Sequence, residues 1–412
     1  MPHGRMATDR FEGINYERMR NYRLNRCKEI MKKHGIDMLV TFDYPAIRYI
    51  TGAYCTPAGR WAEGRIAVLP VNGDPYLFNS TSFSPYKIRE EMPWMKGRIW
   101  PGPVPYSRAK LTADAPIFVN FAQRIKEFME ENHLQGGVVG LDGTVSFHLY
   151  SKAFENAGLK VTDARQIMYE CFLIKSPDEI ECIRQSASIA EGAFDAMREA
   201  IRPGIRECDL MGIGAKRLYE LGADEGQEFV IASGPRTNPL HIDFTDRQVR
   251  PGDLVVIDIN ASCFQGYKTC YYRTFCCGKA TQEQKDCFQE CYEMLYNGMS
   301  AIKNGAIVQD VIDKWPSSPS YWGYDTWPEV SAYACGHGIG LSLHEFPGIG
   351  HLGPDMMQQE LKTGMVFALE TWTGKRGGDF GVRLEEFVAV TDTGYDLLSK
   401  YPVDHLIECN PY

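Results

Sequence analysis

The sequence predicts a two-domain protein of the α/β (α+β) class, on three observations. The first half alternates an amphipathic helix with short apolar strands, a strongly capped helix start lies near residue 176, and strands dominate the last third. A chain of 412 residues is long enough for two or three domains, and 44% hydrophobic residues are sufficient to fill sizeable cores.

The first domain is expected to span residues 1–168. A long amphipathic helix is predicted at Arg18–His34, followed by three apolar runs with strand character: Asp37–Phe42, Arg65–Pro70 and Gly137–Gly140. Between these strands lies a stretch rich in proline and aromatic residues, Trp94–Tyr106. Because repeated proline fixes φ and removes backbone donors, we expect no regular structure there.

The domain boundary is signalled by the segment Lys175–Glu179. Ser176 fits an N-cap, Pro177 fits the first helical position, and Glu179 stands where a capping box needs its acid. A long helix should therefore begin at this point and stop before Pro203-Gly204. The second domain is expected to span residues 169–412.

Further elements of the second domain follow from the same patterns. Helices are predicted at Glu207–Leu221 and Gln282–Ile302, and strands at Leu254–Ile259, Tyr267–Cys276, Met365–Leu369 and Arg383–Thr391. The economical arrangement is a mixed or antiparallel sheet with helices on one face.

Composition excludes several classes of protein. There are 44 basic and 53 acidic residues, a net charge of −9, so no electrostatic term favours a phosphate backbone or an anionic lipid surface. Nucleic-acid and membrane partners are therefore not expected. Neither a signal-peptide core nor a run of about 18 apolar residues is visible, which predicts a cytoplasmic protein. Thirteen scattered cysteines predict reduced, mostly buried thiols.

Polar residues interrupt apolar strands near the C-terminus. Asp258 follows Val-Val-Ile, His337 lies between two glycines, Glu370 follows Val-Phe-Ala-Leu, and Glu385 precedes another apolar run. Buried carboxylates are costly unless they are paired or ligated. One Asp, one His and two Glu that converge from different strands would suit Mn, Fe, Co or Zn. Each residue alone is also explained as a satisfied polar group of the core or of a strand edge.

These motifs resemble the creatinase/aminopeptidase P/methionine aminopeptidase superfamily, whose catalytic domain has the pita-bread fold. The resemblance covers most of the chain and rests on a run of motifs in order: Lys-Ser-Pro-Asp-Glu at 175–179, Ser233-Gly234 with Asn238 and His241, Gly252-Asp253, Gly266-Tyr267, Arg273-Thr274, GHGIGLSLHEFP at 336–347, and Glu370 with Glu385. It implies a creatinase-like N-terminal domain followed by a pita-bread catalytic domain.

In the metal-dependent members of this superfamily, two Asp, one His and two Glu hold two metal ions. By position, the ligands here would be Asp258 or Asn260, then Cys270, His337, Glu370 and Glu385. The aspartate that bridges the metals is thus replaced by Cys270.

The interval from Asp258 to Cys270 is one residue longer than in the peptidases. It resembles that of the dimethylsulfoniopropionate lyase branch, in which a further metal-binding aspartate stands where this chain has Asn260. Two departures remain. The base used by that lyase is not matched within Leu341–His344, and the catalytic histidine of creatinase, a metal-free relative, falls at Thr237.

Two neutral residues in place of carboxylates disfavour a dinuclear centre. The expected cofactor is at most one divalent transition metal, Fe, Zn or Mn, or none at all. Cys270 can then be a metal ligand, a nucleophile with His337 as its base, or a small hydrophobe that fills the place of a lost ligand.

Other residues are expected to contact the substrate. By the same resemblance, His241 and His344 match two histidines that contact substrate and move protons in the peptidases. Arg383 can orient Glu385 or bind a substrate carboxylate. Tyr54 and Trp61 are candidates for cation–π contacts with a sulfonium or quaternary ammonium group.

The preferred hypothesis is a homodimeric, non-peptidase hydrolase or lyase that cleaves a C–N or C–S bond of a small zwitterionic substrate. One alternative is an Xaa-Pro aminopeptidase or prolidase that uses one metal. A second is a catalytically inactive binding protein.

Overall fold

The computed structural model describes residues 13–53, 64–79, 92–102, 112–143, 146–225, 228–260, 264–330 and 334–410. The chain forms two compact units, a smaller one from Asn15 to Phe172 and a larger one that contains Leu173–Tyr412. Within these ranges, no helix is both long enough and apolar enough to cross a membrane. Most of the eleven cysteines in these ranges are buried, as the composition predicts.

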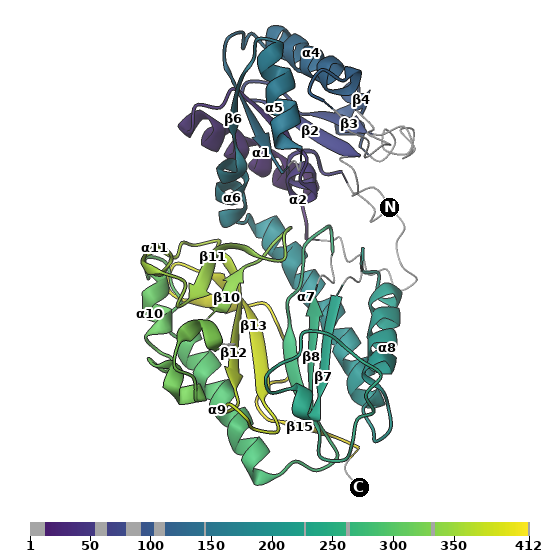
Figure 1. The fold of residues 1–412 in the computed structure, drawn as a ribbon, viewed down its shortest axis with the longest axis vertical. Helices are drawn as coiled ribbons and strands as arrows, with labels where there is room; N and C mark the ends of the chain where they lie inside the picture. Colours follow the sequence, from purple (N-terminus) through teal and green to yellow (C-terminus); the bar gives the residue numbers. More distant parts are fainter. Residues whose placement is uncertain are drawn as a thin grey trace. The chain divides into compact units, whose positions relative to one another are not determined.

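The smaller unit is built on a six-stranded sheet (Figure 1). Its strands run in the order β4-β3-β2-β1-β5-β6, with bounds β1 (Met38–Thr41), β2 (Arg65–Pro70), β3 (Tyr76–Asn79), β4 (Ile99–Pro101), β5 (Val138–Asp142) and β6 (Lys160–Asp163). β1 pairs antiparallel with β2 and parallel with β5. The central strands are buried, which is why they read as continuous apolar runs in the sequence.

The helices of this unit are α1 (Tyr16–Lys33), α2 (Tyr44–Thr51), α4 (Pro116–Glu131), α5 (Phe147–Asn156) and α6 (Arg165–Leu173), of which α2 packs on β2 and α5 on β6. α1 and the three predicted strands lie where the periodicity placed them. The expectation of an irregular Trp94–Tyr106 segment is wrong in its described part, where a 3-10 turn (Pro93–Met95) precedes β4. β4 is an edge strand, and Pro101 is tolerated at its end because an edge position need not donate to the ladder.

A buried carboxyl group lies at the end of β5. Asp142 is 5% exposed and accepts a hydrogen bond of 2.6 Å from the Thr41 hydroxyl. Burial raises the pKa of Asp142 to about 7, and the neighbouring Asp43 and Asp163 add to the rise. The folded state therefore binds this proton more tightly than the unfolded state, whose aspartate pKa is about 4.

Asp142 should make the stability of the smaller unit depend on pH. Its contribution is fully present below about pH 4 and is lost as the pH rises through about 7, a change of roughly 2–4 kcal/mol. In Asp142→Asn, urea unfolding followed at pH 5 and pH 8 should show a smaller loss of stability than in the wild type. Asp74→Asn, at an exposed carboxylate of the same unit, is the matched control. An unchanged pH slope in Asp142→Asn would contradict this assignment.

The larger unit begins with the long helix α7 (Pro177–Ala200). Ser176 accepts from the Glu179 backbone, and the Glu179 carboxylate accepts from the Ser176 backbone, so the predicted capping box is present. α8 (Glu207–Glu220) follows and packs on α7 and on β7. Both helix starts agree with the sequence prediction.

Two sheets form the core of the larger unit (Figure 1). The four-stranded sheet has the order β15-β9-β8-β7, with bounds β7 (Glu228–Ser233), β8 (Leu254–Asn260), β9 (Tyr272–Cys277) and β15 (Ile407–Cys409). The five-stranded sheet has the order β11-β10-β12-β13-β14, with bounds β10 (Ala334–Gly338), β11 (Glu345–Gly350), β12 (Val366–Thr373), β13 (Val382–Val390) and β14 (Tyr395–Leu397).

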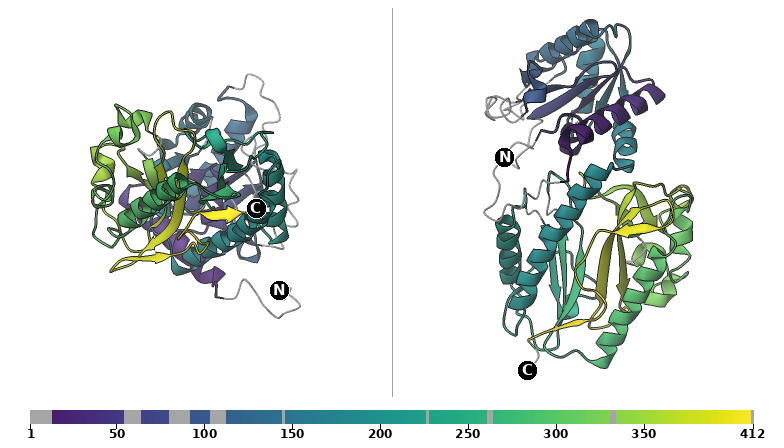
Figure 2. Two further views of the ribbon diagram at one scale, coloured as in Figure 1. Left: turned by 90° about the horizontal axis from the view of Figure 1, so that it is seen from below. Right: turned by 180° about the vertical axis from the view of Figure 1, so that it is seen from behind.

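The expectation of a single sheet is wrong, because the unit has two sheets, and each is covered by helices. α7 packs on the four-stranded sheet through Phe194, whose ring contacts those of Tyr271 and Phe275. α9 (Gln282–Met299) packs on β12 and β13, as both views of Figure 2 allow the reader to follow. Shorter elements complete the unit: α10 (Val308–Ile312), α11 (Pro354–Met357) and 3-10 turns at Gly234–Arg236, Pro319–Trp322 and Trp327–Glu329.

The two sheets meet along β9 and β13, where side chains alternate between two sides. On one side, Arg273 donates to both carboxylate oxygens of Glu386 at 3.0 Å, and each side chain is 2% exposed. On the other side lie Tyr272 and Glu385. The alternation follows from the period of two in a strand. One carboxylate of the Glu385-Glu386 pair is thus neutralised by an arginine, while the other faces the site described below.

The Arg273–Glu386 pair should be essential for the stability of the larger unit. Arg273→Met leaves a buried carboxylate without its cation, which should cost about 3–5 kcal/mol of unfolding free energy. Adding Glu386→Gln removes the uncompensated charge and should recover much of that loss. If chemical denaturation gives Arg273→Met an unfolding free energy within about 1 kcal/mol of the wild-type value, the pair is dispensable.

Candidate metal centre

Three buried side chains converge where the two sheets meet. Cys270 lies two residues before β9, His337 lies in β10 and Glu385 lies in β13. One ligand atom from each, the thiol sulfur, an imidazole nitrogen and a carboxylate oxygen, lies within 4.8 Å of the other two. The structure thus brings together three of the residues that the sequence proposed as metal ligands.

Two atoms of this cluster are buried without a hydrogen-bond partner. The Nδ1 of His337 lies 2.9 Å from the Gly338 carbonyl, which fixes the ring, while its Nε2 has no partner. Glu385 Oε2 accepts from the Tyr272 backbone at 3.1 Å, while Oε1 has no partner. Because buried polar atoms are normally satisfied, these two atoms can accept a metal ion or a hydrogen-bond donor. A single divalent transition metal fits this donor set, since thiolate, imidazole and carboxylate all ligate zinc and iron.

Asp258 and Asn260 form the adjoining part of the site, on β8. Asp258 is fully buried; its Oδ1 accepts from the Tyr271 backbone at 2.9 Å, and its Oδ2 accepts from the Asn260 amide at 2.6 Å. Burial raises the pKa of Asp258 to about 7, and the charge of Glu370 adds to the rise.

Electrostatics separate the possible roles of Cys270. Burial and the charges of Glu385, Asp258 and Glu370 hold the pKa of its thiol well above the usual range. Burial, with a contribution from His344, lowers the pKa of His337 to about 4. A nucleophilic thiolate beside an imidazolium needs the opposite shifts. The surroundings therefore disfavour a thiolate–imidazolium pair.

Glu370 and Arg383 form an ion pair at the edge of the cluster. Two guanidinium nitrogens of Arg383, Nε and one terminal nitrogen, lie 2.8 and 2.7 Å from Glu370 Oε2. β12 and β13 place Glu370 directly opposite Glu385. Arg383 therefore orients Glu370 rather than Glu385, which corrects one of its two expected roles. Its role as an anchor for a substrate carboxylate stays a prediction.

Tyr272 is a site residue that the sequence analysis missed. It lies directly opposite Asp258 in the β8–β9 ladder, and the Arg383 guanidinium lies over its ring at 4.9 Å. Burial raises the pKa of its phenol well above 10, so it stays protonated. Side chains alternate along β9, so Tyr272 lies on the side opposite Arg273. This alternation could have identified Tyr272 only if the register of β9 with β8 had been known.

The two histidines assigned to proton transfer lie in different surroundings. His344 is exposed, and its ring centroid is 4.3 Å from that of His337. His241 is also exposed, and its Nδ1 lies 3.4 Å from the Arg236 guanidinium. The structure thus places His344 at the cluster, whereas the contact recorded for His241 is with Arg236.

A buried ion pair holds the turn that carries His344. Lys175 Nζ lies 2.7 Å from Glu345 Oε2, and both side chains are 3% exposed. Glu345 Oε1 also accepts from the Ser342 backbone at 3.0 Å. The Lys175 segment that starts α7 therefore also fixes the loop between β10 and β11.

Two predicted substrate contacts, Tyr54 and Trp61, lie outside the described residues.

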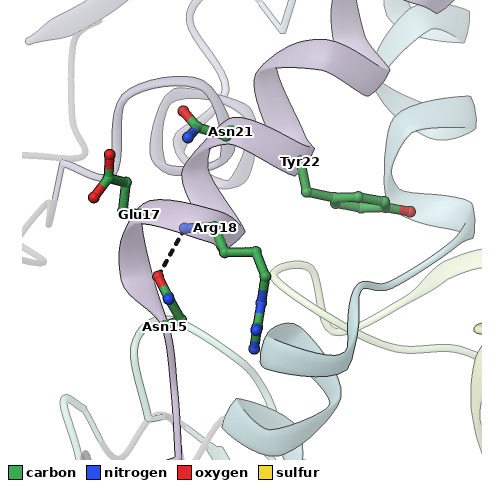
Figure 3. A pocket seen from close by; sticks show the side chains of 5 residues that line it. All are labelled: Asn15, Glu17, Arg18, Asn21 and Tyr22. Carbon is green, nitrogen blue, oxygen red and sulfur yellow. Dashed lines mark hydrogen bonds between the residues drawn. The ribbon is translucent and has the colours of Figure 1, made fainter.

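A depression on the smaller unit is lined by five residues of the first turns of α1: Asn15, Glu17, Arg18, Asn21 and Tyr22 (Figure 3). Asn15 accepts from the Arg18 backbone there as the N-cap of the helix. Its polar groups are thus those of an ordinary helix start.

The fold is that of the pita-bread class, and three candidate ligands converge in it. The chain belongs to metallopeptidase family M24, whose model matches residues 181–392, and the model of the creatinase/prolidase N-terminal domain matches residues 23–171. The resemblance inferred from the motifs is thereby confirmed.

Similar proteins include both peptidases and lyases. The Xaa-Pro dipeptidase of Pyrococcus furiosus is 28% identical over 302 residues, which cover 72% of this chain and 82% of that protein. The dimethylsulfoniopropionate lyase DddP of Roseovarius nubinhibens is 24% identical over 427 aligned positions, which cover 97% and 90%. A recombinant prolidase from Thermococcus sibiricus has the same fold, with a TM-score of 0.74 and 23% identity over 96% of this chain and 100% of that structure.

Proposed function

We propose that this chain is a hydrolase or lyase that acts on a small zwitterionic substrate with the help of one divalent transition metal. One observation carries the proposal: Cys270, His337 and Glu385 offer ligand atoms within 4.8 Å of one another, and two of the three residues have an unpartnered buried atom there. A bound metal would supply a Lewis acid that polarises the substrate or activates water.

The residues around the cluster would bind and orient the substrate. Arg383 holds Glu370 in place, and Tyr272 and Asn260 extend the site along β8 and β9. His344 is exposed beside His337 and can pass a proton between substrate and solvent. We further propose a homodimer, as expected from the resemblance.

The same residues support a non-peptidase reaction. Cys270 and Asn260 stand where two charged ligands hold the second metal in the metal-dependent members of the superfamily. Cleavage of a C–N or C–S bond in a small zwitterion is therefore preferred, by analogy with DddP and with creatinase. A prolidase that uses one metal is the second candidate, because the Xaa-Pro dipeptidases of Pyrococcus are among the similar proteins.

Removal of Cys270 should abolish tight binding of the metal. In zinc titration by calorimetry, the wild type should bind one ion per chain, and Cys270→Ser should bind it at least about 100-fold more weakly, since even the loss of an outer-shell partner costs up to that much. Wild-type affinity should rise with pH, because the thiol must lose its proton, and the variant should release about one proton less on binding.

The control for this titration is Cys335→Ser, at another buried cysteine outside the cluster. It should retain wild-type affinity. Two tightly bound ions per wild-type chain, or unchanged binding in Cys270→Ser, would contradict the proposal. Assaying the metal-loaded protein with Xaa-Pro dipeptides, and separately with guanidino acids, betaines and sulfonium compounds, separates the two candidate activities. An inactive binding protein would turn over none of them.

A further inference from the structure

Two cysteines lie opposite each other where β15 joins the four-stranded sheet. β15 pairs parallel with β9, and the register places Cys409 directly opposite Cys277. Each cysteine is the last residue of its strand. The cysteine of the candidate metal centre, Cys270, precedes the other end of β9. The pair therefore lies outside the site described above.

The strand pairing brings the two residues close to the separation that a disulfide needs. Neighbouring strands lie about 4.7–4.9 Å apart, and the Cα atoms of a disulfide lie about 4.4–6.8 Å apart. Paired residues also direct their side chains to the same face of the sheet. The Gly278 backbone donates to the Cys409 carbonyl at 2.7 Å, which holds the two strands together at this end. Because a disulfide holds its Cβ atoms about 3.5–4.5 Å apart, they need to approach by only about half an ångström.

Alternation along the strands separates this pair from the neighbouring thiol. Cys276 lies opposite Glu408, so its side chain points to the other face of the sheet. There it belongs to the apolar core that also contains Phe288 of α9. Cys409 can therefore reach Cys277 but not Cys276.

The surroundings of the two thiols make their oxidation slow and its product durable. Cys277 is fully buried and Cys409 is 4% exposed. Burial raises the pKa of the Cys277 thiol to about 11 and that of the Cys409 thiol to about 12. Few thiolates are thus present to start an exchange, but thiolates of high pKa are also poor leaving groups once a disulfide has formed. Local opening of β15, an edge strand of three residues, gives an oxidant access.

We propose that Cys277 and Cys409 form a redox-sensitive clasp, a disulfide that joins β15 to β9 under oxidising conditions. The oxidant is a low-molecular-weight disulfide such as oxidised glutathione. One cysteine loses its proton, and its thiolate attacks the oxidant, so that a mixed disulfide forms and one glutathione thiolate leaves. The second cysteine, also as a thiolate, attacks the protein sulfur of the mixed disulfide and releases the second glutathione thiolate. Two protein thiols are thereby oxidised, and one glutathione disulfide is reduced to two thiols.

Peptide mapping of the native protein tests the clasp directly. The wild type is equilibrated with oxidised glutathione, alkylated and digested with trypsin. The peptide of residues 274–279, which contains Cys276 and Cys277, should then be linked to the peptide that begins at Tyr401 and contains Cys409. Dithiothreitol should release the link. Absence of this linked pair from the oxidised wild-type protein would overturn the inference.

Variants assign the bond, because Cys276 and Cys277 share one tryptic peptide. Cys276→Ala, the matched control, should retain the link, whereas Cys277→Ser and Cys409→Ser should lose it. A link that survives in Cys277→Ser, or that is lost from folded Cys276→Ala, would place the bond at Cys276 and overturn the inference.

The clasp should also stabilise the larger unit, because it closes a long loop in the unfolded chain. The midpoint of thermal unfolding should rise by about 5–10 °C when the wild type is oxidised, and it should not rise in Cys409→Ser. A link that forms without this rise would distort the strand pairing and would overturn the clasp. Both results are expected for the metal-free and the zinc-loaded protein alike, so the clasp and the proposed function can fail independently.

Discussion

The gathering of three carboxylates in one site, two of them buried and one partly buried, is the constraint on which the rest of the larger unit depends. Asp258, Glu370 and Glu385 come from three strands, and burial, together with their mutual repulsion, raises the pKa of Asp258 and Glu385. Such a cluster persists in a folded protein only if positive charge or hydrogen-bond donors offset it. The junction of β9 with β13 supplies backbone donors, and Arg383 supplies one cation.

The proposal of one metal agrees with the charges and ligands that remain at the site. With Cys270 bound as a thiolate, the thiolate and the three carboxylates carry four negative charges, against the three positive charges of Arg383 and one divalent ion, and a substrate cation can offset the remaining charge. A second divalent ion would find no further carboxylates, because Asn260 and Cys270 occupy the positions of the extra acids. Cys270 still offers a soft sulfur ligand. Because it is buried beside Glu385, it can bind only a metal ion that lies in the cluster.

Signals carried by a few neighbouring residues predicted helix starts well. Features that depend on the pairing of distant strands were predicted poorly. The Ser176 capping box depends on four consecutive residues, so it could be read directly. The edge strand at Ile99–Pro101 forms by pairing with β3. The prolines of this segment favoured an irregular structure in the sequence analysis, so the strand was not predicted. At the site, family motifs placed Cys270, His337, Glu370 and Glu385, but they could not show that Arg383 holds Glu370, that Tyr272 faces Asp258, or that Asn260 Oδ1 is unpartnered. Those facts depend on the register of neighbouring strands.

Absorption spectroscopy of the cobalt-substituted protein tests the central claim most directly. Titration of the metal-free protein with Co²⁺ should saturate at one equivalent and should develop a sulfur-to-cobalt charge-transfer band, because the Cys270 thiolate is a ligand. Cys270→Ser should lose this band, whereas Cys335→Ser should retain it. Saturation at two equivalents, or a saturated spectrum without a thiolate band, would contradict a mononuclear centre built on Cys270, His337 and Glu385.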